Sequence, residues 1–231
     1  MKETLNYYKE LSAKKNFRIL KWDREFNYSA VNNFAVDYSK GDYLLFLNND
    51  TEIITKDWIQ GLLEHAQREN IGAVGAKLYF PDNTLQHAGI VVGLFDSAGH
   101  IMQGAEKEYK ELPYTKDITR NWSAVTAACL MINKKKFQMV DGFDEELKIA
   151  LNDVDFCLKL LEGGYFNVYT PYVELYHHES ISVGRPESLQ RDKVLNKKEI
   201  GLFKEHWRHN PRNDRFFNKN YSLSSYTLEY R

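Results

Sequence analysis

Hydrophobic residues along this chain recur with two spacings, one typical of helices and one typical of buried strands. Spacings of three and four predict helices, and these cover residues 2–15, 28–38, the stretch after Thr55, and 152–162. Apolar runs predict strands at residues 17–22, 43–47, 73–80, 90–94 and 125–132, with shorter ones at 166–169 and 174–176. Because strands and helices alternate in the first half, the pattern predicts a parallel α/β sheet.

Polar residues mark the ends of several of these elements. Ser29 and Thr55 are expected to cap the helices that they begin. Residues 95–120 are polar and irregular, which predicts a loop. The tail after Pro186 is charged, then helical over 203–207, and then aromatic.

Composition is that of an ordinary globular protein and excludes several classes. The 231 residues fit one large domain with a small appendage, and a net charge of -1 gives no support for a nucleic-acid partner. Cys129 and Cys157 lie in apolar stretches, which predicts two buried thiols. No apolar run approaches a membrane span and the N-terminus has no signal-peptide core, so we expect a cytoplasmic setting, with peripheral attachment at the inner membrane face left open.

The segment Asn48-Asn49-Asp50 follows the most continuous apolar run. In α/β sheets ligands bind beyond the carboxyl ends of strands, and oxygen side chains there suit a hard divalent cation or a ribose hydroxyl. The alternative is a turn or helix-capping cluster, which is common after strands.

Two further clusters have the same ambiguity. Asp153 begins a helix, where the macrodipole favours a carboxylate that can accept a hydroxyl proton, but a plain N-cap fits the pattern too. His177 and His178 can complete a metal shell, or form a solvated surface pair. Motifs for zinc, P-loop and serine-hydrolase chemistry are absent from the sequence.

Taken together and in order, these signals resemble the family 2 inverting glycosyltransferases, in the branch often labelled rhamnosyltransferase-like. The matching stretches are residues 26–33, 41–52, 74–78, 86–89, 123–130, 142–145, 152–158, 175–180 and, in the tail, 214–218. The resemblance implies an A-type glycosyltransferase fold, a Rossmann-like mixed sheet flanked by helices. It implies a catalytic domain over 1–185, with a partial nucleotide-binding half at 1–52 and an acceptor-side half at 53–185, followed by a tail at 186–231.

The resemblance also implies roles on the donor side. The family's Asp-x-Asp motif falls on Asn48, Asn49 and Asp50. Asp50 is then expected to bind Mn²⁺ or Mg²⁺ bridging the donor diphosphate, with Asn48 near ribose or metal-bound water. Either His177 or His178 corresponds to the family's late metal-binding histidine.

On the acceptor side, the family's Glu-Asp motif falls on Asn152-Asp153, which makes Asp153 the expected general base. The other acceptor-side residues expected are Asn152, Ala127, Ala128, Trp122 and His87. For Trp122 and His87 a core or surface position fits the sequence equally well.

The chain departs from the family at its start. The opening strands, which end in Pro-x-Tyr-Asn and Asp-x-x-Ser and build most of the base pocket, have no counterpart in the sequence. We therefore expect an N-terminally truncated form of the fold. Its exposed sheet edge would invite pairing with another chain, for example in a homodimer.

The expected activity is hexosyl or rhamnosyl transfer with inversion, assisted by metal, in polysaccharide or cell-wall biosynthesis. The donor would be UDP-, dTDP- or GDP-linked, and the acceptor a glycan or lipid-linked glycan. Two alternatives stay open. One is a non-catalytic remnant that binds a glycan or partner, and the other is a metal-dependent hydrolase using Asp50 and the histidines.

Overall fold

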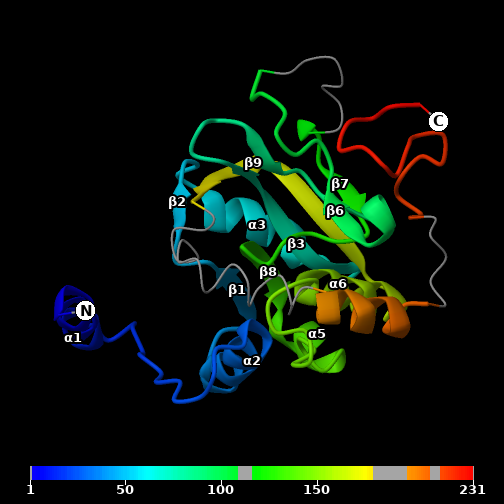
Figure 1. The fold of residues 1–231 in the computed structure, drawn as a ribbon. Helices are drawn as coiled ribbons and strands as arrows, with labels where there is room; N and C mark the ends of the chain where they lie inside the picture. Colours follow the sequence, from blue (N-terminus) through cyan, green and yellow to red (C-terminus); the bar gives the residue numbers. More distant parts are fainter. Residues whose placement is uncertain (1, 109–115, 179–196, 209–213, 231) are drawn as a thin grey trace.

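The computed structural model describes residues 2–108, 116–178, 197–208 and 214–230 (Figure 1). The end of the 175–180 motif and the start of the tail lie outside these residues. In chain order the elements are α1 Lys2–Ser12, α2 Tyr28–Tyr38, β1 Tyr43–Leu47, β2 Thr51–Ile53, α3 Trp58–Ala66, β3 Ile71–Tyr79, β4 Leu85–His87, β5 Ile90–Val92, η1 Leu94–Asp96, β6 Ala98–His100, β7 Arg120–Trp122, β8 Cys129–Asn133, α5 Lys134–Met139, α6 Asn152–Glu162 and β9 Phe166–His177. A further helical segment, here called the tail helix, covers residues 197–206.

The main sheet has seven strands and is mixed. Its order is β1-β8-β3-β9-β2, with β4 paired to β3 and β7 paired to β9. β8 is antiparallel to both β1 and β3, whereas β9 is parallel to β3. The mixed sheet expected from the family resemblance is therefore present, and the wholly parallel sheet expected from element alternation is wrong because β8 is inserted between β1 and β3.

Helices cover both faces of this sheet (Figure 1). Alternation along β3 divides its side chains, so that Val74, Ala76 and Leu78 pack with α3 in one core cluster, while Ala73 and Tyr79 belong to the other. That second cluster includes Val154, Phe156, Cys157, Leu158 and Leu160 of α6. All nine residues of β3 are buried, which fits its largely apolar sequence, and the one charged residue, Lys77, pairs with Asp117 and Glu174.

Several expectations about local structure are corrected. Residues 17–22 form no strand, since no described strand lies beside them, and Phe17 and Ile19 are 51% and 43% exposed. Asn27, not Ser29, caps α2, and Ser29 instead donates to the carbonyl of Leu147.

The other corrections concern loops and strand lengths. Thr55 does not cap α3: it accepts a hydrogen bond from the amide of Glu174 in β9, and the N-cap position is Asp57, whose side chain makes no capping hydrogen bond. The stretch predicted as a loop, 95–120, contains β6 and the start of β7. The two short strands expected near residue 170 are one long strand, β9. Both cysteines are free and buried, as expected.

The tail packs back onto the domain. The tail helix lies beside α6, and the segment 214–230 lies near β6 and β7 (Figure 1). Asp214 accepts a hydrogen bond from the amide of Val92, and Arg120 donates to the carbonyl of Phe216. Within the described residues, no helix has both the length and the apolar character needed to cross a membrane.

Candidate functional site

Three strands bring side chains to one edge of the sheet. β1 and β3 run in the same direction and β9 is parallel to β3, so their carboxyl ends meet at this edge. Asn48, Asn49 and Asp50 follow β1, and His177 is the last residue of β9. β2 pairs Thr51 with His177, so Asp50 lies one residue before the partner of this histidine, and the two side chains meet diagonally.

Asp50 and His177 form a close, largely buried pair. The Oδ1 of Asp50 lies 3.1 Å from Nε2 of His177, and the two side chains are 20% and 11% exposed. The side-chain nitrogen of Asn48 lies 3.2 Å from the same Nε2. An amide nitrogen only donates, so this contact requires the neutral tautomer in which Nε2 is the acceptor. In this tautomer the ring of His177 cannot donate to Asp50, although the two side chains lie within ion-pair distance. Oδ1 of Asp50 is therefore buried without a hydrogen-bond donor.

This arrangement fits a divalent cation. A ring-nitrogen lone pair and a carboxylate oxygen face each other at 3.1 Å with no positive charge between them, which is unfavourable for two acceptors. In an octahedral shell with ligand distances of about 2.0–2.1 Å, neighbouring ligand atoms stand about 3 Å apart. Asp50 and His177 therefore have the chemistry and the separation of two adjacent ligands.

The neighbouring candidates lie differently. The side chain of His178 points to Glu52, with Nε2 3.3 Å from its Oε2, while its backbone amide donates to the carbonyl of Asp50. Successive residues of an extended chain project to opposite sides, so only one of the two histidines can face Asp50. Asn49 is exposed.

Asp153 lies in the first turn of α6 and is held by backbone donors. Its Oδ2 accepts from the amide of Ala127 at 3.2 Å, and its Oδ1 accepts from the amide of Val154 at 2.9 Å. Leu151, the N-cap residue, has φ 60 and contributes no side-chain cap. The helix N-terminus thus presents a half-buried carboxylate in a fixed orientation.

The dipeptide Ala127–Ala128 joins the two carboxylate groups into one site. Ala128 accepts a hydrogen bond from the amide of Asn48 at 3.0 Å, and Ala127 donates to Asp153 at 3.2 Å. Consecutive Cα atoms are only about 3.8 Å apart, so Asn48, whose side chain contacts His177, and Asp153 are bound to adjacent residues. A substrate held at this point can meet a cation site and a carboxylate at once.

The other acceptor-side candidates are buried around this site. Asn152 is 5% exposed, and its side-chain nitrogen has no hydrogen-bond partner. His87 is fully buried next to the 126–128 segment, and its Nε2 accepts a hydrogen bond from the amide of Thr126. Burial lowers the pKa of His87 well below its usual value. Trp122 is 1% exposed and packs so tightly on Gly89 that a Cβ there would lie 2.1 Å from the indole. At φ +115 this position also requires glycine.

Three residues at the site were not identified from the sequence. Tyr28 donates to the carbonyl of Ala127, and burial together with the charge of Asp153 raises its pKa. Gln86 contacts the ring of His177 from β4. Tyr28 and Gln86 lie inside stretches that resemble the family, and this position in a motif was the signal that could have identified them. Glu199 of the tail helix, which binds the loop before α6, had no such signal.

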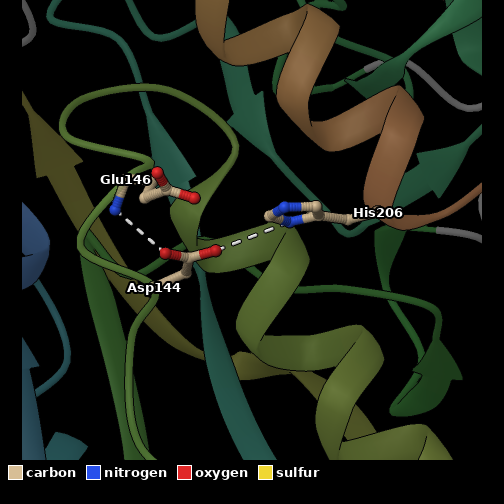
Figure 2. A group of neighbouring side chains, drawn as sticks. All are labelled: Asp144, Glu146 and His206. Atoms are coloured by element: carbon tan, nitrogen blue, oxygen red, sulfur yellow. Dashed lines mark hydrogen bonds and ion pairs between the residues drawn. The ribbon is translucent and has the colours of Figure 1, made fainter.

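A second group of metal-type ligands lies elsewhere. Figure 2 shows Asp144 between Glu146 and His206, with ligand atoms within 4.8 Å of one another. The two oxygens of Asp144 are already engaged, since Oδ1 accepts from the amide of Glu146 at 2.9 Å and Oδ2 lies 3.5 Å from Nδ1 of His206. These contacts attach the tail helix to the loop before α6, and Glu146 and His206 are exposed.

A family model described as glycosyl transferase family 2 matches residues 1–136, which is more than half of the 231 residues. The chain belongs to glycosyl transferase family 2. The matched region includes β1, the Asn48–Asp50 segment, β3, β4 and the Ala127–Ala128 dipeptide, and stops before α6. The family resemblance seen in the sequence is thus confirmed.

Curated relatives of this family 2 chain come from bacteria and are much longer. It is 40% identical over 223 residues to an uncharacterized protein, y4gI, of Sinorhizobium fredii, covering 96% of this chain and 24% of that protein. It is 43% identical over 164 residues to the O-antigen biosynthesis protein RfbC of Myxococcus xanthus, covering 71% and 13%. It is 36% identical over 61 residues to the N-acetylglucosaminyl-diphospho-decaprenol L-rhamnosyltransferase of Mycobacterium tuberculosis, covering 26% and 20%.

Solved structures share the fold of this family 2 chain. A structure described as GalNAc-T7 with UDP, GalNAc and Mn²⁺ superposes with a TM-score of 0.56 at 16% identity, covering 92% of this chain and 44% of that one. The mannosyltransferase PcManGT from Pyrobaculum calidifontis, in complex with GDP-Man and Mn²⁺, gives 0.53 at 10% identity, covering 91% and 57%. The A-type glycosyltransferase fold is thereby confirmed.

Proposed function

We propose that this chain is the catalytic part of a metal-assisted glycosyltransferase that transfers a sugar from a nucleoside-diphosphate donor with inversion. The observation that carries the proposal is the Ala127–Ala128 dipeptide, which is hydrogen-bonded on one side to Asn48 and on the other to Asp153. Because the side chain of Asn48 contacts His177, the dipeptide links the proposed cation ligands to the backbone-held carboxylate of Asp153. Glycosyl transfer needs both, one for the leaving diphosphate and one for the acceptor hydroxyl.

On the donor side, Asp50 and His177 would hold Mn²⁺ or Mg²⁺. When bound, the ion supplies positive charge that offsets the charge growing on the departing diphosphate. The unpartnered Oδ1 of Asp50 and the lone pair of His177 support this assignment. Both similar solved structures are described as Mn²⁺ complexes, one with UDP and GalNAc and the other with GDP-Man. His178, which faces Glu52, is assigned no metal role.

On the acceptor side, Asp153 would act as general base. Its carboxylate takes the proton of the acceptor hydroxyl while that oxygen bonds to the anomeric carbon and the bond from that carbon to the diphosphate oxygen breaks. The amides of Ala127 and Val154 hold the carboxylate in place, and an oxygen that already accepts one hydrogen bond keeps a lone pair for the substrate. The unpaired amide nitrogen of Asn152 next to it would donate to the acceptor.

The names of two relatives support a proposal for the substrate class. One is named for O-antigen biosynthesis and another for rhamnosyl transfer to a sugar on a lipid diphosphate. We propose a nucleotide-linked hexose or deoxyhexose as donor and a glycan, free or lipid-linked, as acceptor, in the synthesis of a bacterial surface polysaccharide.

The test is release of nucleoside diphosphate from UDP-glucose, dTDP-rhamnose and GDP-mannose, each with and without Mn²⁺. Metal-dependent release from one donor, lost when Mn²⁺ is chelated, is expected. Release that is equally fast without a divalent cation would overturn the metal assignment. Thermal shifts with a donor but no release, even with added polysaccharide acceptor, would favour the non-catalytic binding module.

A further inference from the structure

Gln86 contacts His177 with both ends of its side-chain amide. In β4, where it is 3% exposed, its Oε1 lies 2.8 Å from Nδ1 of His177 and its Nε2 lies 3.4 Å from the backbone carbonyl of the same residue. The histidine is therefore held on the side opposite to Asp50 by a single buried group.

The carbonyl of His177 determines which way the Gln86 amide faces. A carbonyl oxygen only accepts, so the amide end beside it must be the nitrogen. The oxygen then faces Nδ1, and since that oxygen also only accepts, Nδ1 must carry the ring proton. In the neutral ring this leaves the lone pair on Nε2, which faces Asp50.

An independent contact gives the same tautomer. The side-chain nitrogen of Asn48 lies 3.2 Å from Nε2 and can only donate, which again requires a lone pair on that atom. Two buried or half-buried amides, one on each side of the ring, thus agree on its protonation pattern.

We infer that Gln86 is a positioning residue that fixes His177 in the tautomer and orientation needed for Nε2 to bind a divalent cation. The inference rests on the proposed metal site. A ligating histidine generally donates its second ring N–H to an oxygen acceptor, and removal of that acceptor costs about 10–100-fold in metal affinity. Here the acceptor is an uncharged amide buried in the sheet, so the metal site does not carry an additional carboxylate.

The experiment compares Gln86→Met with Gln86→Glu on the intact chain. Methionine has similar length but removes the acceptor, whereas glutamate keeps an oxygen for Nδ1–H. Gln67→Met, the same change at an exposed position, is the matched control. Two readouts are taken: the ring-nitrogen NMR spectrum of the metal-free protein, with the His177 signals assigned by their loss in His177→Gln, and Mn²⁺ affinity by electron paramagnetic resonance.

We expect an Nδ1–H ring at His177 in the wild type, in Gln67→Met and in Gln86→Glu. In Gln86→Met this signature should be lost, and Mn²⁺ affinity should fall by about 10–100-fold while the melting curve stays cooperative. An Nε2–H ring in the wild type, or unchanged Mn²⁺ affinity in Gln86→Met, would overturn the inference. If Gln86→Met does not fold, loss of the Nδ1–H ring in Gln86→Glu would overturn it, and its retention would support it.

Failure of the metal site itself would look different. A wild-type protein that binds no Mn²⁺ contradicts the proposed function and the ligand role of His177. The NMR spectrum then still decides whether Gln86 positions the ring, since it is recorded without metal.

Discussion

The two halves of the site are built in contrasting ways. On the proposed donor side, Asp50 follows β1 and His177 ends β9, and the pairing of β2 with β9 holds these two segments together. On the base side, Asp153 follows an irregular loop and a residue, Leu151, in the left-handed conformation. A leucine there costs about 1–2 kcal/mol, which other contacts must offset.

Those contacts come from far along the chain. Glu199 of the tail helix is 1% exposed and accepts hydrogen bonds from the amides of Lys148, Ile149 and Ala150 at 3.0, 3.2 and 2.6 Å. The comparison teaches that the donor side is a property of the sheet, whereas the base side depends on a helix outside the matched region 1–136.

The largest effect is expected for Asp153→Asn. The amide cannot take the acceptor proton, so donor turnover should fall by about 10²–10⁴-fold. Mn²⁺ affinity should be unchanged, because Asp153 contacts the amides of Ala127 and Val154 and not the Asp50–His177 pair. Steady-state release of nucleoside diphosphate measures the first quantity, and turnover equal to wild type would reject the general-base assignment.

Glu199→Ala should weaken the base side alone. It leaves three part-buried amides without their acceptor, at roughly 1–3 kcal/mol each, so we expect the free energy of unfolding to fall by roughly 3–5 kcal/mol after partial rehydration. Urea denaturation measures the change. Glu205→Ala, an exposed residue of the same helix, is the control and should unfold like wild type. If Glu199→Ala lowered Mn²⁺ affinity as much as it lowered turnover, the donor side and the base side would not be independent.

A smaller loss is expected for Trp207→Phe. The indole donates to Oδ1 of Asp155 at 2.9 Å, and the phenyl ring keeps the packing but not the donor. A hydrogen bond to a charged group contributes about 1.5–3 kcal/mol, so stability should fall by that amount or less, since Lys159 still pairs with the other oxygen at 3.2 Å. A free energy of unfolding equal to that of the wild type would show that the hydrogen bond of Trp207 does not stabilise α6.

His178→Ala should have the smallest effect. Its ring pairs with Glu52, whose side chain is 68% exposed, and such surface pairs contribute about 1 kcal/mol or less. Mn²⁺ affinity should not change, whereas His177→Ala should abolish it. If a Mn²⁺ titration showed loss of binding in His178→Ala and normal binding in His177→Ala, His178 would be the metal ligand instead of His177.

The same contrast explains what the sequence could predict. The apolar run 43–47 predicted the strand that Asp50 follows, and the helical spacing over 152–162 predicted the helix whose first turn holds Asp153; both elements are present. Which of His177 and His178 faces Asp50 depends on side-chain contacts at the end of β9, and no local pattern in the sequence shows them. Residues 17–22 have the pattern of a strand but no partner, so periodicity gave the wrong answer there.

Gln86 and Glu199 show why the rest was not predictable. β4 is only three residues long, too short for a periodic pattern, and Gln86 acts by meeting His177 across 91 positions of sequence. Glu199 meets its amides across 49 to 51 positions, and a single carboxylate in a charged tail carries no local sign of that contact.

Binding of Mn²⁺ to Asp50→Asn and to Asp153→Asn, followed by the electron paramagnetic resonance signal of the free ion, tests the two-sided site most directly. We expect Asp50→Asn to lose binding and Asp153→Asn to bind like wild type, since Asp50 contacts His177 whereas Asp153 is held by the amides of Ala127 and Val154. Wild-type binding by Asp50→Asn, or loss of binding in Asp153→Asn, would contradict the account.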